Sequence, residues 1–397
     1  MTYKKNTFRR AAAAAAAICL AFAFAFADKT GADKLGFGTS VTVSAADLVY
    51  DTGTTAKLYY TVKAYGEITI TKVIPGSETR IDVPASIDGK KVTAIENQAF
   101  ANCATLESIT LPESISGISK DLFKGCTSLK IVFLCQNTYT YDGAIPESTA
   151  EIQYAYDSST GGMAIVKGKS NGQTSIDIPE TICGRKVTTI NAVAFSNNNF
   201  KNVTSFTLPQ SLTAIGNGAF SGCSSLTSIV IPDSVTEIEA TAFSNCTALE
   251  SITLSQNIKE IRNSTFSNCT ALKSIDIPSK TTSIENYVFQ DCTALTTVTL
   301  HEGLTSIGNA TFKNCTALKS INIPNGVTSI ESSLFSKCTS LTEITLPGSV
   351  TNISYNAFSN CIALKSINIS DGVTDIASEA FQNCSSLETI TLPESVT

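Results

Sequence analysis

The sequence predicts a mainly-β fold: a right-handed solenoid of 23-residue coils with parallel strands, interrupted and capped by β-hairpins. The strongest indication is a row of eight cysteines, each 23 residues after the last. These are Cys223, Cys246, Cys269, Cys292, Cys315, Cys338, Cys361 and Cys384. The residues around each cysteine repeat almost unchanged, and a fixed period of this length indicates a solenoid.

The first 27 residues have the composition of a signal peptide. Four basic residues come first, namely Lys4, Lys5, Arg9 and Arg10. An apolar run follows over residues 11–27 and ends in Ala-Phe-Ala, which fits a cleavage site. A membrane anchor is the alternative, but 17 mostly Ala residues are short for a span. We expect cleavage after residue 27, a linker over residues 28–46, and no membrane insertion of the mature chain.

Two alternating apolar and polar stretches predict β-hairpins, at Leu58–Val73 and Ile152–Val166. Gly66 and the Gly161-Gly162 pair supply the turn residues. Each stretch precedes a block in which proline and phenylalanine stand 16 residues apart, against 11 in the ordinary repeat. We expect each hairpin to cover an open end of a solenoid, as terminal repeats must.

The two hairpins divide the chain into two cassettes. The first, residues 47–150, holds a hairpin cap and a short run of two repeats, at Phe100 and Phe123. The second, residues 151–397, holds the other hairpin cap and a long solenoid. The last repeat has only 17 residues and no C-terminal cap follows it. We therefore expect either an exposed edge there or a truncated chain.

One repeat, starting at Pro232, shows how a coil is built. Its inward positions are apolar: Val235, Ile238, Phe243, Cys246, Leu249, Ile252 and Leu254. The alternation over Leu249–Leu254 predicts a strand with one buried face. The β-branched segment Val235–Ile238 predicts a smaller strand on the opposite wall. Proline ends the first strand, and the residues before Phe243 should form a turn or a helical turn.

The repeat resembles a known family. Its unit is Ala-Phe-Ser-x-Cys-x-x-Leu-x-x-Ile-x-Leu-Pro-x-x-Val-Thr-x-Ile, and it resembles the BspA-like leucine-rich repeat over roughly residues 57–397. The resemblance implies a leucine-rich-repeat solenoid. It also implies a secreted or surface-attached protein of mucosal or gut bacteria. Some members act as adhesins for host matrix proteins such as fibronectin or fibrinogen. The repeat defines a scaffold, so the resemblance speaks for the fold more than for the function.

The repeated cysteines are expected to form a ladder of buried, reduced thiols, because each lies between Phe and Leu core positions. Disulfides between successive coils are an alternative, but the Cβ vectors of stacked cysteines would run parallel, which is poor bridging geometry. A metal site is a weaker alternative, because no cysteine pair has C-x-x-C spacing and the chain has 1 histidine. We expect no metal and no cofactor.

The charge balance argues against nucleic acid as a partner. After cleavage, 24 basic and 34 acidic residues would remain, a net charge of −10. A protein that binds the phosphate backbone of a nucleic acid needs clusters of Lys and Arg on its surface, and an acidic chain does not favour such clusters.

The sequence also gives little support for an enzymatic function. The single histidine, His301, occupies a slot that other repeats fill with proline, and we expect it to be an exposed turn residue. Paired carboxylates such as Glu237 and Glu239 are expected to be solvated. We therefore predict no catalytic residue.

The outward positions of the main strand form a Ser/Thr-rich face with a lysine on alternate coils. The candidate contact residues there are Lys273, Ser274, Thr297, Thr299, Lys319, Ser320, Thr345 and Lys365. A plain solvated sheet face is the alternative interpretation. A second candidate contact site comprises tyrosines of the hairpin caps, Tyr59, Tyr60, Tyr154 and Tyr156, for which cap packing is the alternative role.

These features predict a secreted or surface-exposed, non-enzymatic, adhesin-like binding protein. Its solenoid strand face would engage extracellular proteins or glycans of a host or a neighbouring cell. The alternative is a structural spacer or display scaffold within a larger cell-surface system.

Overall fold

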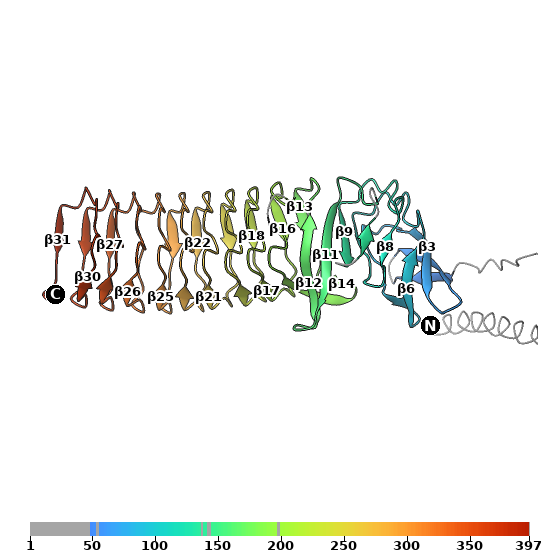
Figure 1. Cartoon of the computed structure of the whole chain (residues 1–397), viewed down its shortest axis with the longest axis horizontal. Coiled ribbons are helices and arrows are strands. Elements are labelled where there is room, and N and C mark those ends of the chain that lie inside the picture. Colours follow the sequence, from blue (N-terminus) through green and yellow to red (C-terminus); the bar gives the residue numbers. More distant parts are fainter. Residues whose placement is uncertain (1–47, 53–54, 136–137, 141–143, 197–198, 397) are drawn as a thin grey trace, which may run out of the picture. The chain divides into compact units, whose positions relative to one another are not determined.

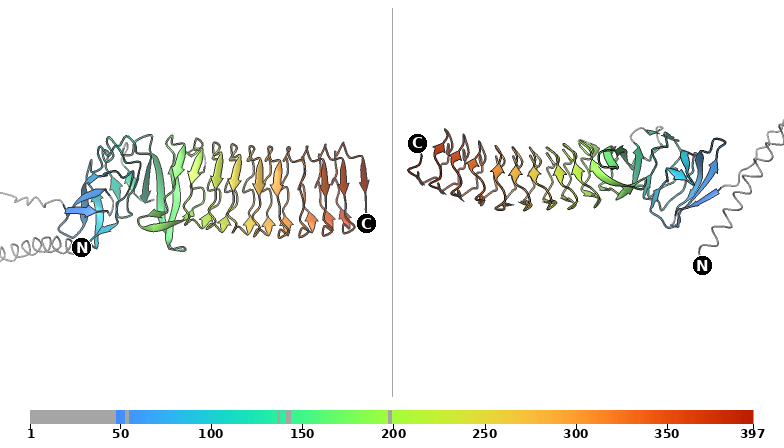
Figure 2. Two further views of the ribbon diagram at one scale, coloured as in Figure 1. Left: turned by 180° about the vertical axis from the view of Figure 1, so that it is seen from behind. Right: turned by 90° about the horizontal axis from the view of Figure 1, so that it is seen from below.

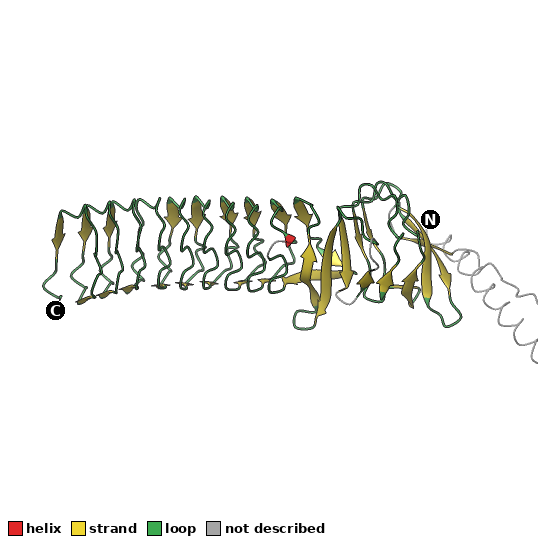
Figure 3. Ribbon diagram, turned by 45° about the horizontal axis from the view of Figure 1, so that its top comes forward, coloured by secondary structure: helices red, strands yellow, loops and turns green. Residues whose placement is uncertain are grey.

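The computed structural model describes residues 48–52, 55–135, 138–140, 144–196 and 199–396. The predicted signal peptide and linker lie outside these ranges. Residues Asp47–Thr397 form one compact unit, which consists of strands and turns apart from a short helical turn at Asn199 (Figures 1 and 3). Among the described residues, no helix is long and apolar enough to cross a bilayer.

The unit begins with the predicted N-terminal hairpin. Strands β1 (Leu48–Asp51), β2 (Lys57–Val62) and β3 (Ile68–Ile74) pair antiparallel, and Gly66 lies in the β2–β3 turn with φ +81°. β3 then pairs in parallel with β6 (Lys90–Ile95), so the hairpin continues one wall of the coils that follow. Its inward residues Leu58, Ile68 and Ile70 are fully buried.

The longer proline-to-phenylalanine spacing has a local cause that the sequence analysis missed. A two-residue hairpin is inserted in each block, between β5 (Ser86–Ile87) and β6, and between β14 (Thr181–Ile182) and β15 (Arg185–Ile190). The turn residues Asp88-Gly89 have φ of 48° and 75°, and Cys183-Gly184 have 52° and 72°. Positive φ at both positions is what the tight turn of a right-twisted hairpin requires.

Most coils contribute one strand to each of two walls (Figure 2). We call the longer strands, which follow the leucine, the main wall, and the two-residue strands the minor wall. In the short cassette the main wall comprises β4 (Arg80–Asp82), β7 (Ser108–Thr110) and β9 (Ile131–Cys135). Its minor wall includes β8 (Gly117–Ile118) and β10 (Tyr139–Thr140), which pair in parallel.

The long solenoid repeats the same two walls. Its main wall comprises β13 (Ser175–Asp177), β16 (Ser205–Thr207), β18 (Ser228–Val230), β20 (Ser251–Thr253), β22 (Ser274–Asp276), β24 (Thr297–Thr299), β27 (Glu343–Thr345), β29 (Ser366–Asn368) and β31 (Thr389–Thr391). Its minor wall comprises β15, β17 (Ala214–Ile215), β19 (Glu237–Ile238), β21 (Glu260–Ile261), β23 (Ser283–Ile284), β25 (Ser306–Ile307), β26 (Ser329–Ile330), β28 (Asn352–Ile353) and β30 (Asp375–Ile376). The paired strands within each wall are parallel and in register, as in Ser251 opposite Ser228.

The second hairpin joins the two cassettes. It consists of β11 (Ala150–Asp157) and β12 (Gly162–Lys169), which pair antiparallel. β11 pairs in parallel with β9, and β12 with β15, so the main wall of the short cassette continues through the hairpin into the minor wall of the long solenoid. The hairpin therefore covers the long solenoid, as expected, and also connects it to the coils before it.

Strand β9 is shared by two cores. Ile131 and Phe133 belong to the core of the long solenoid, whereas Val132 and Leu134 belong to the core of the short cassette. All four side chains are at most 5% exposed. Period-2 alternation sends neighbouring side chains to opposite faces, so this strand needs an unbroken apolar sequence.

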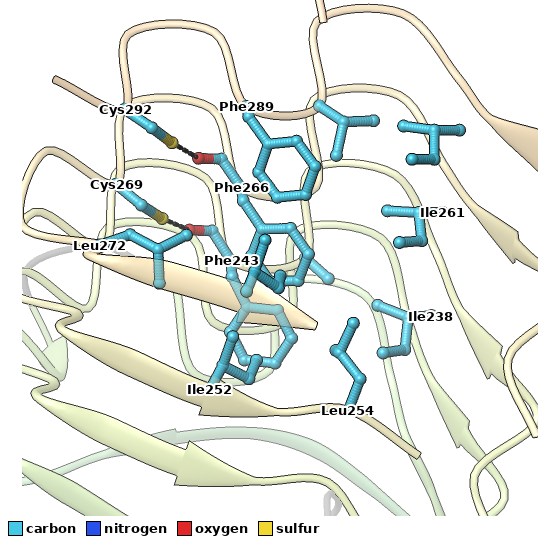
Figure 4. Close-up of a cluster of buried hydrophobic side chains, with 14 of the residues drawn as sticks. Ile238, Phe243, Ile252, Leu254, Ile261, Phe266, Cys269, Leu272, Phe289 and Cys292 are labelled. Carbon is cyan, nitrogen blue, oxygen red and sulfur yellow. Dashed lines mark hydrogen bonds between the residues drawn. The ribbon is translucent and has the colours of Figure 1, made fainter. Parts of the chain in front are cut away.

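The long core is a stack of aromatic rings flanked by the two walls (Figure 4). From Phe220 to Phe381, successive rings of the repeat lie nearly parallel with centroids 5.1–5.7 Å apart. Ile238 and Ile261 of the minor wall and Ile252 of the main wall close over the rings. This arrangement buries apolar surface between coils, which a single coil cannot do.

Asparagine recurs before the cysteine for a backbone reason. Asn245, Asn268 and Asn314 have φ of 62°, 62° and 61°. Among residues with a side chain, Asn tolerates this left-handed region well. The Asn-Cys-Thr triplets are thus a consequence of how each coil turns.

Candidate binding surfaces

The eight predicted contact residues of the main wall are all exposed. They alternate with buried residues such as Ile275, Val298 and Ile344, so their side chains leave the core. Neighbouring coils align them in rows, with Thr297 opposite Ser274. Ser320 lies between β24 and β27, in a coil whose main-wall segment forms no ladder with its neighbours.

The lysines of this face differ in their surroundings. Lys273 Nζ lies 2.5 Å from Glu250 Oε2 of the preceding coil, and both side chains are more than half exposed. Lys319 and Lys365 follow in the same row, two and four coils further on. Neither makes an ion pair within the described residues. Because neighbouring coils lie about 4.8 Å apart, the backbones of Lys319 and Lys365, two coils apart, are separated by roughly 10 Å.

Some threonine hydroxyls of this wall are engaged in hydrogen bonds with the preceding coil. Thr296 Oγ1 donates to Lys273 O at 3.0 Å, and Thr342 Oγ1 donates to Lys319 O at 3.4 Å. Thr299 Oγ1 likewise donates to Asp276 Oδ1 at 2.6 Å. These threonines thus cross-link adjacent coils, whereas the ammonium groups of Lys319 and Lys365 remain free to contact a partner.

The cap tyrosines separate into two kinds. Tyr60 is 6% exposed and Tyr154 is 1% exposed, so both are packing residues and are not available to a partner. Tyr154 donates its hydroxyl to Leu111 O and lies 3.2 Å from Cys183 Sγ, and burial raises its pKa. Tyr59 is half-buried. Tyr156 is 49% exposed, with the Arg185 guanidinium 4.8 Å from its ring centroid.

The cysteine ladder contains no disulfide among the described residues, and its thiols are hydrogen-bonded. All twelve described cysteines are free thiols. Each repeat thiol donates to the phenylalanine carbonyl of the preceding coil, as in Cys269 Sγ to Phe243 O and Cys292 Sγ to Phe266 O, both 3.2 Å (Figure 4). Burial raises the pKa of Cys292 and of Cys338 to about 12. The thiols are therefore protonated donors, a role that the sequence analysis did not predict.

Of the paired carboxylates at the minor wall, Glu237 is exposed, as expected, whereas Glu239 is half-buried. Arg262 lies between them, with Nη2 3.0 Å from Glu237 Oε1 and Nε 3.6 Å from Glu239 Oε2. Partial burial, followed by the neighbouring Glu237, raises the pKa of Glu239. The single guanidinium thus offsets part of the negative charge of the two carboxylates.

His301 is half-buried, not fully exposed as expected. Its Nδ1 accepts a hydrogen bond from Gly303 N at 3.1 Å, which holds the turn after β24. Within the described ranges, no group of three or more His, Cys, Asp or Glu residues is placed to hold a metal ion.

The minor wall is hollowed, which the sequence analysis missed. A cleft of ≈ 530 Å³ crosses three coils and is lined chiefly by residues 283–286, 305–309 and 327–329 and by Glu331. We call it the minor-wall cleft. Gly308 stands in the row between Glu285 and Glu331, so one side chain is missing from the middle coil. That substitution within the repeat is the sequence signal for the cleft.

The cleft lies at a break in the minor-wall ladder. Thr305 N bonds Thr282 O, and Thr351 N bonds Thr328 O, both at 2.9 Å. The equivalent bond from Thr328 N to Thr305 O is missing, and β25 does not pair with β26. On the phenylalanine side the coils stay joined, with Phe312 N bonded to Leu334 O at 3.0 Å. The two coils are therefore separated at their strands and held together at the opposite edge.

Comparison with known proteins identifies a family whose repeat this chain matches. It matches the BspA type leucine-rich repeat region in 6 copies, over residues 82–156, 188–319 and 305–397. The comparison with curated proteins finds no match.

Several solved structures are similar. A leucine-rich repeat protein from Bacteroides ovatus is 23% identical with a TM-score of 0.50, over 86% of this chain and 88% of that one. A leucine-rich cell surface protein from Faecalibacterium prausnitzii is 27% identical with a TM-score of 0.39, over 87% and 95%. The pneumococcal vaccine antigen PcpA is 18% identical with a TM-score of 0.40, over 88% and 92%. The first of these supports the fold alone. Because the family match spans more than half of the residues and its repeats coincide with the observed coils, this chain belongs to the BspA-type leucine-rich repeat family.

Proposed function

We propose that this protein is a secreted or surface-exposed, non-enzymatic binding protein whose main wall engages an extracellular protein, in the manner of an adhesin. The observation that carries the proposal is the row of exposed lysines on a regular polar wall, in which Lys319 and Lys365 have no ion-pair partner among the described residues. A wall of this kind offers repeated contacts at fixed spacing, which suits an extended protein surface.

A protein partner fits this wall better than a glycan. The eight contact residues include no aromatic side chain on which a sugar ring could stack. The exposed lysines alternate with Thr296 and Thr342 and lie near Glu250 and Glu343, so the wall presents both signs of charge. Charge patterns of this type steer partners and select among them. The predicted signal peptide supports export.

The proposal is tested by reversing charge on the main wall. The variant Lys273→Glu/Lys319→Glu/Lys365→Glu should bind extracellular-matrix proteins, probed as a panel including fibronectin and fibrinogen, at least tenfold more weakly. Binding of the unaltered protein should also weaken with salt. The far-UV spectrum should not change, because these side chains lie outside the core.

A matched variant controls for net charge. Lys280→Glu/Lys313→Glu/Lys337→Glu changes the charge equally, but these residues lie on turns and not on main-wall strands. It should bind the panel almost as the unaltered protein does. Equal losses in both variants, or no loss in the first, would remove the main wall from consideration.

A spacer or display role is the second candidate. The observation that favours it is the regularity of the long solenoid, whose phenylalanine stack runs unbroken from Phe220 to Phe381. A spacer predicts that neither triple variant affects binding, because the wall would contact nothing.

A further inference from the structure

The chemistry of the minor-wall cleft restricts what it could hold. Its lining contains no lysine, arginine or histidine, and it includes the carboxylates of Glu285 and Glu331. Phosphate, sulfate and uronate groups would meet only negative charge there. The remaining polar groups are hydroxyls and amides, such as Ser306, Ser329 and Asn309. The cleft therefore disfavours an anionic ligand, and most of its polar contacts come from neutral hydroxyls and amides.

An asparagine ladder fixes the orientation of the amides along the cleft. Asn286 Oδ1 accepts hydrogen bonds from Asn309 N at 2.8 Å and from Asn309 Nδ2 at 3.0 Å. Asn309 Oδ1 in turn accepts from Ser332 N at 3.2 Å. The backbone N of Asn286 donates to Asn263 Oδ1 at 3.1 Å. The side-chain oxygen of Asn286 is used within the protein, so its side-chain nitrogen Nδ2 remains a donor with no partner in the described part of the chain.

Other groups of the cleft add acceptors and further donors. The Ser283 and Ser306 hydroxyls and the Glu331 carboxylate make no hydrogen bond with described residues. At the open junction between coils, Thr328 N and Thr305 O lack the bond that the flanking coils make. Donors and acceptors thus alternate over a short distance. A ligand rich in hydroxyl groups can satisfy both, because each hydroxyl donates and accepts.

An exposed aromatic residue, Tyr287, follows the cleft lining in sequence, although it is not itself a lining residue. Tyr287 follows the lining residue Asn286, and its backbone N bonds Asn309 O, also in the lining, at 2.9 Å. Its side chain is 46% exposed, although its φ of 61° is unfavourable for a bulky residue. The same row holds small Ser264, Ala310 and Ser333 in neighbouring coils. A tyrosine ring supplies an apolar face with a polar tip at low entropic cost.

We propose that the minor-wall cleft binds a short, neutral, hydroxyl-rich glycan, with the ring of Tyr287 as a stacking surface at its rim. The volume of ≈ 530 Å³ lies within the usual range of about 300–1,000 Å³ for small-ligand sites. The site is on the wall opposite to the proposed protein-binding face, so either function can fail without the other.

The test compares four single variants of the full chain in titration calorimetry. The probes are neutral gluco-, manno- and galacto-oligosaccharides, an oligogalacturonate and an oligolysine peptide. Tyr287→Ala removes the ring, and Ser306→Arg fills the cleft from an exposed position. Each should weaken binding of the neutral oligosaccharide roughly tenfold, and the oligogalacturonate should not bind the unaltered protein.

Two variants serve as matched controls. Tyr355→Ala removes another 46% exposed tyrosine of the same solenoid, which lies outside the cleft lining. Thr297→Arg adds an arginine to the main wall. Both should bind the neutral oligosaccharide unchanged. Failure of every neutral oligosaccharide to bind, binding of oligolysine in their place, or equal losses in the controls would overturn the proposal.

Discussion

The repeat cysteine has two roles in each coil. Its side chain fills the core beside the phenylalanine stack, and its thiol donates to a carbonyl of the preceding coil. Buried carbonyls carry two lone pairs and are often only partly satisfied. Here Phe266 O accepts both Cys269 N of its own coil, at 3.2 Å, and Cys292 Sγ of the next. A cysteine is small enough and apolar enough to make this bond without a cost of burial like that of a hydroxyl.

Thiol reactivity should follow this arrangement residue by residue. The thiolate is the reactive form, and burial raises the pKa of Cys292 to about 12. In native protein, maleimide should label the half-buried Cys135 and Cys384 first, because the last ladder cysteine is not fully buried, and the buried ladder cysteines from Cys223 to Cys361 only after denaturation. Mass spectrometry of labelled peptides gives the order. Rapid native labelling of Cys292, or bridges between successive coils, would show that the ladder is not buried and reduced.

Two-residue hairpin turns set the geometry of both inserted blocks. In each, a residue with φ near +50° is followed by glycine, and no L side chain suits the second position. These turns carry the chain from the hairpin strand into the first minor-wall strand. The backbone conformation of the turn glycine, and not a packing contact, should determine how much its substitution lowers the free energy of unfolding.

The glycine of the first turn allows this to be measured. A Cβ on Gly89 would meet no atom within 4 Å, but its φ is +75°. Gly89→Ala should therefore lower the free energy of unfolding by about 1 kcal/mol through backbone strain alone. Gly348→Ala is the control, because its Cβ would also meet nothing and its φ is not positive. Equal urea-unfolding midpoints for the two variants would show that backbone strain at Gly89 does not set the cost of the substitution.

The sequence predicts the regular elements well because they repeat. The strands at Ser251–Thr253 and Glu237–Ile238 follow from alternation and β-branched residues seen in many copies. The inserted hairpins escaped notice although Asp88-Gly89 is a strong turn signal, because they interrupt the period. The burial of Tyr60 and Tyr154 could not be read from the sequence, since alternation does not say which face of a hairpin meets a neighbouring core.

At the scale of the whole unit, two features depend on how the coils stack on one another. Strand β9 contributes to both cores, which couples the short cassette to the long solenoid. Arg80 adds to this connection, since its guanidinium donates to Thr181 O at 3.2 Å across the boundary. The minor-wall cleft arises from a break between β25 and β26, where stacking loosens on the strand side only. Both features follow from stacking and neither is visible in one repeat.

The central functional claim is that the main wall is the face that contacts an extracellular protein. Lysine acetylation footprinting, read by mass spectrometry with and without the bound protein from the matrix panel, tests it most directly. The account predicts that Lys319 and Lys365 become protected while Lys313 and Lys337, away from the main-wall strands, react as before. Protection of Lys313 and Lys337, with Lys319 and Lys365 unchanged, would contradict it.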